Sequence, residues 1–209
     1  DRHVKNGLGE TPAIIWEGGG IGASRIITYN ELFKEVNRLA GALKSLGVQK
    51  GDRVLMFMPT VPEAMYAMLA CSRLGAIHAS VFSGYGIDSI VERIHSAKPK
   101  VVMTADASVR RSRAVPLKDT LDIALEKAPV ETVVVLNRGV AKATTKPGRD
   151  VDWATLVKEK GVDFVEPEQM DSKEPSHIVF TSGDTGNPRG VVIDTGSYGK
   201  LKGDLLHRS

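Results

Sequence analysis

The stretch from Thr181 to Gly190 combines residue types that are suited to holding a phosphate. It reads Thr-Ser-Gly-Asp-Thr-Gly-Asn-Pro-Arg-Gly and lies between two apolar runs, 178–180 and 191–193. Glycines let a backbone turn sharply and bring its N–H groups close to an anion. Hydroxyl groups add donors, and Arg189 adds a fixed positive charge. The pattern therefore predicts a phosphate-binding loop held between two strands.

Two other interpretations of this stretch are a Walker A loop and a surface turn. It is not a Walker A loop, because the required Gly-Lys-Ser/Thr ending is absent. Clusters of Ser, Thr, Gly, Asp and Pro also form ordinary surface turns, and composition alone favours that reading.

The composition is that of an ordinary globular protein. The 209 residues are 42% hydrophobic, with a mean hydropathy of −0.12, and suffice for one large domain or two small ones. No apolar run approaches the length of a membrane span, and no signal peptide opens the sequence. We therefore expect a cytoplasmic protein with no membrane partner.

Charge and cysteine content narrow the function classes further. The 28 basic and 25 acidic residues give a net charge of +3, and aromatics make up only 5%. That balance, without aromatics among the basic residues, argues against a nucleic-acid partner. Cys71 is the single cysteine, so no internal disulfide is possible; its apolar helical surroundings predict a buried structural thiol.

Alternating helical and strand patterns predict an α/β fold, layered, with a mostly parallel sheet flanked by helices. Capping boxes are expected at Thr28–Glu31 and Thr60–Glu63. The predicted helices span 29–46, 61–74, 87–97, 117–127 and 153–160. The predicted strands span 54–58, 77–82, 101–104, 132–136, 177–180 and 191–193. Segments 138–149 and 164–175 are predicted to be an exposed loop and a connector.

Three consecutive glycines, 18–20, could be mistaken for a nucleotide-binding loop. They lack the Gly-x-Gly-x-x-Gly spacing, and no helix follows them directly. A hairpin turn between strands at 13–16 and 25–28 is the preferred interpretation.

Several motifs resemble the adenylate-forming superfamily, which includes the AMP-forming acyl-CoA synthetases, in order and spacing. The phosphate loop of that superfamily usually reads Thr-Ser-Gly-Ser/Thr-Thr-Gly-x-Pro-Lys-Gly. The further motifs are Lys50-Gly-Asp-Arg-Val54, Met58-Pro59, Pro62-Glu-Ala64, Gly75-Ala-Ile-His78, Val81-Phe-Ser-Gly84 and Thr104-Ala-Asp106.

The resemblance implies a domain organisation. It covers about 1–198, which we expect to be an incomplete N-terminal domain, followed by a divergent tail at 199–209. The C-terminal half and the mobile C-terminal domain of the superfamily are expected to be absent. The start at Asp1 rather than Met fits a piece of a longer protein.

The resemblance implies a two-step reaction in which a short-chain carboxylate and Mg·ATP give acyl-AMP and pyrophosphate, and CoA then displaces AMP. The implied small-molecule partners are the carboxylate, ATP and CoA, with Mg²⁺ as cofactor. Gly148-Arg-Asp150, Asp152-Trp-Ala154 and Glu174-Pro-Ser176 place propionate slightly ahead of acetate.

The resemblance also assigns ATP phosphate-binding residues. It implies that the loop wraps the β- and γ-phosphates and that Arg189 closes it. The residues are Thr181, Ser182, Gly183, Asp184, Thr185, Gly186 and Arg189.

Two of these positions depart from the family pattern. Arg189 replaces a lysine and keeps the charge with a different geometry. Asp184 replaces a hydroxyl residue, and a carboxylate about 4 Å from a phosphate would repel it by about 4 kcal/mol at an effective dielectric of about 20. Alternatively, Asp184 points outward or helps to hold hydrated Mg²⁺.

A second set of residues resembles the CoA site of the family. Arg110 and Arg113 fall on the positions that hold the CoA 3′-phosphate, and charge-assisted arginine contacts suit a phosphate dianion. Phe82, Ser83 and Gly84 match a loop that lines the pantetheine tunnel, with Ser83 in place of a frequent glycine. Without the family context, the arginines would read as a solvated basic turn.

No catalytic residue and no metal ligand set is identifiable in the sequence, and His78 reads as a satisfied core histidine. We expect the isolated chain to be inactive, and to self-associate through sheet edges and an exposed apolar face. The rivals to an enzyme fragment are a truncated, non-catalytic CoA- or nucleotide-binding relative and a basic nucleic-acid-binding domain.

Overall fold

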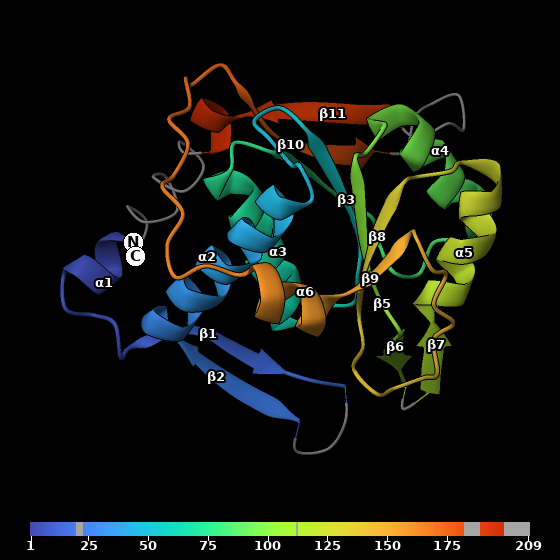
Figure 1. The fold of residues 1–209 in the computed structure, drawn as a ribbon, viewed down its shortest axis with the longest axis horizontal. Helices are drawn as coiled ribbons and strands as arrows, with labels where there is room; N and C mark the ends of the chain where they lie inside the picture. The colour runs from blue at the N-terminus through green and yellow to red at the C-terminus, as the bar shows by residue number, and fades with distance from the viewer. Residues whose placement is uncertain (20–22, 112, 182–188, 199–209) are drawn as a thin grey trace.

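The computed structural model describes residues 1–19, 23–111, 113–181 and 189–198, and these form six helices and eleven strands (Figure 1). The helices are α1 Arg2–Lys5, α2 Tyr29–Ser45, α3 Pro62–Arg73, α4 Ile87–Ala97, α5 Leu117–Lys127 and α6 Trp153–Lys160. The strands are β1 Pro12–Glu17, β2 Ser24–Thr28, β3 Arg53–Phe57, β4 Ile77–Ser80, β5 Val101–Ala105, β6 Ala107–Arg110, β7 Arg113–Pro116, β8 Thr132–Leu136, β9 Asp150–Asp152, β10 Pro175–Thr181 and β11 Arg189–Asp194.

Seven strands form the central sheet in the order β11-β10-β4-β3-β5-β8-β9. All neighbours pair in parallel except β10 and β11, which form an antiparallel hairpin at one edge. Strands β1 and β2 form a separate antiparallel hairpin, as do β6 and β7. The prediction of an α/β fold with a mostly parallel sheet is therefore confirmed.

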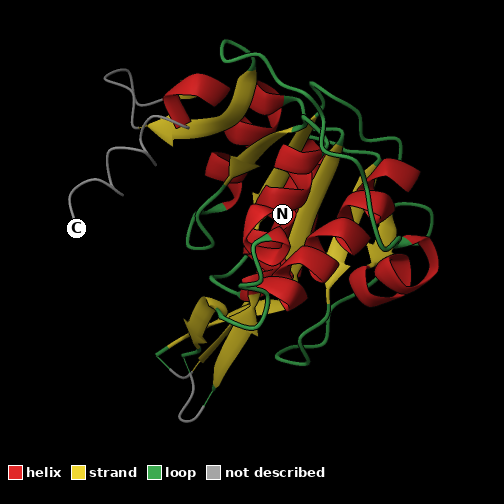
Figure 2. Ribbon diagram, turned by 90° about the vertical axis from the view of Figure 1, so that its left-hand side faces the viewer, coloured by secondary structure: helices red, strands yellow, loops and turns green. Residues whose placement is uncertain are grey.

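Helices cover both faces of this sheet, which gives three layers (Figures 1 and 2). Val54 and Met56 of β3 pack with α2, α3 and α6 on one face. Leu55 and Phe57 of the same strand pack with α4 and α5 on the other face. Because β3 is buried on both faces, its sequence is a continuous apolar run rather than an alternating one.

Helix α2 begins as its sequence predicts. The Thr28 hydroxyl accepts from the Glu31 N–H at 3.2 Å, and the Glu31 carboxylate accepts from the Thr28 N–H at 2.8 Å. These two bonds make the expected capping box, which satisfies two of the otherwise unpaired donors at the helix start.

The second predicted capping box, Thr60–Glu63, is wrong. Helix α3 begins at Pro62 with Val61 as its N-cap, and no side chain caps it. The Thr60 carbonyl instead accepts a hydrogen bond of 2.9 Å from the Trp16 indole, which ties β1 to the loop before α3. Proline in the first turn is confirmed, since its missing N–H costs nothing there.

Strand β4 is shorter than predicted. It ends at Ser80 instead of continuing to 82. The Val81 N–H still donates to the Met56 carbonyl at 2.8 Å, and the chain then turns, with the Tyr85 N–H donating to the Phe82 carbonyl at 3.1 Å. The short elements α1, β6, β7 and β9 were not predicted at all.

Two residues that were expected in the core behave differently from one another. Cys71 is fully buried, and burial raises the pKa of its thiol to about 12, which confirms a structural role.

His78 stacks on His177 with 5.1 Å between ring centroids, but its buried Nδ1 has no hydrogen-bond partner among the described residues. Burial and the neighbouring His177 lower the pKa of His78 to about 4, so the ring is neutral at pH 7. The expectation of a fully satisfied histidine is thus wrong at one atom.

The hairpin β10–β11 exposes an apolar surface. Val179, Val191 and Val192 are 43 to 56% exposed, and β11 is an edge strand of the sheet. Such an edge offers unpaired backbone groups to another chain, and self-association through it remains a prediction. Among the described residues, no helix has the length and apolar character to cross a bilayer.

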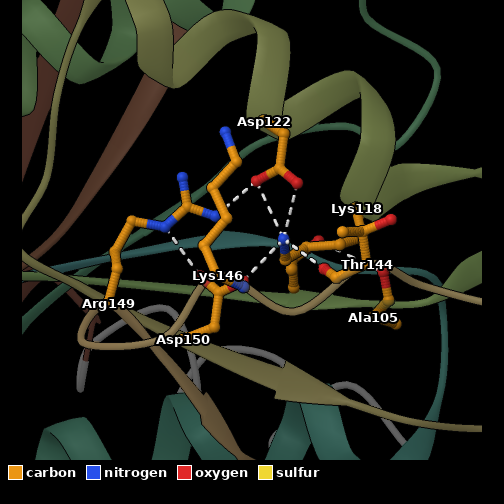
Figure 3. A network of polar contacts seen from close by, with 8 residues as sticks. Ala105, Lys118, Asp122, Thr144, Lys146, Arg149 and Asp150 are labelled. Carbon is orange, nitrogen blue, oxygen red and sulfur yellow. Dashed lines mark hydrogen bonds and ion pairs between the residues drawn. The ribbon is translucent and has the colours of Figure 1, made fainter.

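A buried ion-pair network fixes the far end of the sheet (Figure 3). The Lys118 side chain is almost fully buried, and its ammonium lies 2.7 Å from Asp122 and 2.8 Å from Asp150. Arg149 contacts the same two carboxylates. Lys118 also donates to the Thr144 carbonyl at 3.0 Å. The network therefore joins α5, β9 and the otherwise irregular loop 138–149.

Asp150 titrates below its ordinary pKa of 3.8 in this network. Burial by itself would raise the pKa, but hydrogen bonds from Arg149 and Lys118 outweigh burial and lower it. A depressed folded-state pKa stabilises the fold above the unfolded-state value. This contribution is lost as the pH falls through the folded-state pKa, below 3.8.

We predict that Asp150→Asn lowers the free energy of unfolding at pH 7 by about 3 kcal/mol, because it leaves Lys118 and Arg149 to share the single carboxylate of Asp122 in a buried site. Urea unfolding followed by circular dichroism measures the change. Asp88→Asn is the matched control, because Asp88 pairs with Lys127 at 2.9 Å on the exposed surface. Equal and small effects of the two substitutions would contradict a structural role of the buried network.

Candidate functional site

The predicted site residues all lie next to strand ends, at the edge of the sheet where the parallel strands have their carboxyl ends. Thr181 ends β10, the segment 82–84 follows β4, and the β6–β7 hairpin follows β5. Because β10, β4, β3 and β5 are parallel, their carboxyl ends lie at the same edge. Strand β11 runs antiparallel, so its first residue, Arg189, also lies at this edge. Ligands of open α/β sheets bind at the carboxyl ends of strands.

The structure describes only the two ends of the predicted phosphate-binding loop. Thr181 and Arg189 are direct partners in the β10–β11 register, and both are exposed. The predicted loop is thus the connection of a β-hairpin. Ser182, Gly183, Asp184, Thr185 and Gly186 lie outside the described residues, so their predicted phosphate contacts remain a prediction.

The two halves of the predicted CoA site come together in space. The Arg110 guanidinium lies over the Phe82 ring, 5.2 Å from its centroid, although 28 positions separate the residues in sequence. A Cβ at Gly84 would lie 2.5 Å from a Phe82 ring carbon and 3.2 Å from Arg110 Nη1. A side chain at position 84 would therefore displace this pair, which gives a physical reason for glycine here.

The arginines occupy the tip of the β6–β7 hairpin. Arg110 and Arg113 are register partners, and Arg111 between them has a left-handed backbone with a φ of 46°. All three are exposed, and a hollow of about 400 Å³ lies beside Arg110 and Arg111. No carboxylate of the described chain pairs with them, so their charge is available to an anion.

Asp106 anchors this hairpin at its base. The side chain is 1% exposed, and its Oδ1 accepts from the Ala107 N–H at 2.7 Å. Its Oδ2 accepts from the N–H groups of Val140 and Ala141 at 2.7 and 3.2 Å. Its main-chain carbonyl accepts from the Leu117 N–H at 3.1 Å, where the hairpin ends. One residue thus fixes both ends of the hairpin.

Sequence reasoning missed this role of Asp106. The available signal was an acidic residue placed directly after the wholly buried strand β5, where only hydrogen bonding makes a buried carboxylate tolerable. Within the described ranges, no three His, Cys, Asp or Glu side chains gather as metal ligands.

Comparisons with known proteins agree with this architecture. The family profile "AMP-binding: AMP-binding enzyme" matches residues 1–201. The chain is 47% identical over 202 residues to the 3-hydroxypropionyl-coenzyme A synthetase of Metallosphaera sedula, covering 95% of this chain and 30% of that protein. It is 46% identical over 201 residues to the acetyl-coenzyme A synthetase of Shewanella baltica, covering 95% and 31%.

A solved structure is similar as well. The fold matches acetoacetyl-CoA synthetase from Streptomyces lividans with a TM-score of 0.81 at 27% identity, over 93% of this chain and 29% of that one. The chain belongs to the AMP-binding, adenylate-forming enzyme family. It spans about 30% of the length of the relatives that it matches.

We predict that Asp106→Asn lowers the free energy of unfolding by about 2 to 3 kcal/mol. The amide turns a donor toward N–H groups that need acceptors, which leaves buried donors unpaired. Thermal unfolding measures the effect, with Asp163→Asn on an exposed position as the control. A variant as stable as the wild-type chain would contradict the anchoring role.

Proposed function

We propose that this chain is the nucleotide- and CoA-contacting portion of an AMP-forming short-chain acyl-CoA ligase. The observation that carries the proposal is the convergence of Arg110, Phe82 and Gly84, from two separate segments, at the sheet edge where β10 and β11 also meet. Relatives named for acetyl and 3-hydroxypropionyl groups support a substrate of two or three carbons. Propionate stays slightly ahead of acetate on the motifs around Trp153.

In this proposal the arginine hairpin holds the CoA 3′-phosphate. Arg110 and Arg113 are register partners at the hairpin tip, and Asp106 keeps the hairpin that carries them in place. Phe82 and Gly84 form an exposed, flat surface next to Arg110, which suits the thin pantetheine arm.

In the same proposal the β10–β11 connection holds the ATP phosphates together with Mg²⁺. Developing negative charge on pyrophosphate requires preorganised N–H donors and cations, which a glycine-rich hairpin connection can supply. Arg189 contributes the cation at its exit. Asp184 weakens this site by repulsion unless a hydrated metal lies between the carboxylate and the phosphates.

We propose the complete two-step reaction for a ligase with the full length of the relatives. The chain covers about 30% of its relatives, and none of its described residues is proposed as a catalytic acid, base or nucleophile. Asp184 favours a second candidate, namely a relative that binds CoA without turnover. Both candidates require the CoA site, so CoA binding tests what they share.

We predict that the chain binds CoA more tightly than dephospho-CoA, and that Arg110→Ala reduces the difference because only Arg113 then holds the 3′-phosphate. Loss of one charge-assisted contact costs about 1.5 to 3 kcal/mol, which corresponds to a roughly 10- to 100-fold weaker CoA affinity. Isothermal titration with both ligands measures this, and Lys158→Ala, on the exposed side of α6, is the control.

Dephospho-CoA is the informative comparison because it lacks only the phosphate that the arginines are proposed to hold. Its affinity should not change in Arg110→Ala. A wild-type chain that binds both ligands equally, or neither, would refute the proposed CoA site.

A further inference from the structure

Arg93, on helix α4, is a buried cation without a counterion. It is 5% exposed, and its Nη1 donates to the Ser89 carbonyl at 2.7 Å within the same helix. Its buried Nε has no hydrogen-bond partner, and no carboxylate pairs with it in the described part of the chain. A buried charge needs compensation from its surroundings.

Aromatic rings provide that compensation. The Arg93 guanidinium lies 4.0 Å from the centroid of the Tyr85 ring and 5.3 Å from that of Phe180. Both distances are within the range of cation–π attraction, which strengthens when the cation is desolvated. Arg93 therefore joins the loop after β4 to strand β10.

The stack continues beyond Tyr85 toward the arginine hairpin. Tyr85 meets Phe82 edge to face with 5.6 Å between ring centroids, and Arg110 lies over Phe82 at 5.2 Å. The sequence of contacts is thus Arg110, Phe82, Tyr85, Arg93 and Phe180. Cations and rings follow one another from β6 to β10.

At its other end the stack reaches the hairpin of the phosphate loop. Phe180 directly precedes Thr181 and is the register partner of Gly190. A Cβ at Gly190 would lie 3.4 Å from a Phe180 ring carbon, so the ring fills the space over that strand. The position of the Phe180 ring and the start of the loop are therefore coupled.

We propose that Arg93 is a positioning residue that holds the segment 82–86 and the end of β10 in one fixed arrangement. The segment needs such support, because it forms no helix or strand and is mostly exposed. The hydrogen bond from Tyr85 to Phe82 closes its turn, and the stack on Arg93 fixes the turn against α4. The inference deepens the proposed function, because the residues positioned are those proposed for CoA and for phosphate.

The chain offers a matched control for this proposal. Arg73, at the end of α3, is 8% exposed and lies beside the stacked rings of Phe33 and Phe164, at 5.6 and 5.3 Å from their centroids. It pairs with Asp1 and contacts none of the proposed site residues. Arg73→Met therefore removes a similar buried stack from a different part of the molecule.

The test compares Arg93→Met, Arg93→Lys and Arg73→Met with the wild-type chain by amide hydrogen exchange. We expect Arg93→Met to raise exchange at least 10-fold in peptides covering 82–86 and 178–181. Arg93→Lys should give a smaller rise, because lysine keeps the charge and loses the flat stacking surface. Arg73→Met should leave both segments unchanged and raise exchange around 33 and 164.

Titration with CoA gives the functional readout. At a temperature well below the unfolding temperature of the variant, Arg93→Met should bind CoA at least 5-fold more weakly than the wild-type chain. Arg73→Met should bind CoA as tightly as the wild-type chain. Unchanged exchange at 82–86 in Arg93→Met, or exchange in Arg93→Lys equal to wild type, would overturn the proposal. If the wild-type chain binds no CoA, the proposed CoA site fails, while hydrogen exchange still decides the role of Arg93.

Discussion

Parallel pairing of the central strands is the constraint on which the proposed site depends. Each parallel strand must be followed by a crossover that returns the chain to the opposite edge, so successive strands deliver their carboxyl ends to one place. In this chain that place receives the end of β10, the loop after β4 and the hairpin after β5. Segments that lie far apart in the sequence, between about residues 80 and 190, therefore meet at one edge of the sheet.

Two buried charged side chains then hold in place the segments that the sheet brings together. Asp106 holds the arginine hairpin by accepting backbone N–H groups, and Arg93 holds the loop after β4 by stacking between rings. Both side chains lie beneath the exposed groups that we propose to touch ligands. When a binding surface consists of a few side chains on irregular backbone, buried residues beneath it must hold those side chains in a fixed position.

Most of the architecture was predictable because local rules and tertiary packing agree. The Thr28 capping box and the apolar spacing of α2, α4 and α5 located these helices well, and the buried apolar runs located β3, β5 and β8. The capping signal at Thr60 was wrong because Thr60 lies one residue before Val61, the actual N-cap of α3. Local sequence does not distinguish these two positions, and tertiary contacts such as the Trp16–Thr60 hydrogen bond decide between them.

Other features could not be predicted, for physical reasons. Strands β6 and β7 have four residues each and carry exposed arginines, so no apolar periodicity marks them. The resemblance named Arg110 and Phe82 separately, but their contact depends on tertiary structure. The stacking of His78 on His177 likewise follows from β4–β10 pairing across about 100 residues, which no local pattern shows.

We propose that the carboxyl edge of this sheet binds a nucleotide polyphosphate at the β10–β11 connection. Titration of the ¹⁵N-labelled chain with Mg·ATP, followed through backbone amide chemical shifts, tests it most directly. We expect the largest shifts at the amides of residues 182–186 and of Arg189. Unperturbed amides in that loop at saturating Mg·ATP, or shifts confined to the separate hollow lined by Arg25, Lys34 and Trp153, would contradict the proposal.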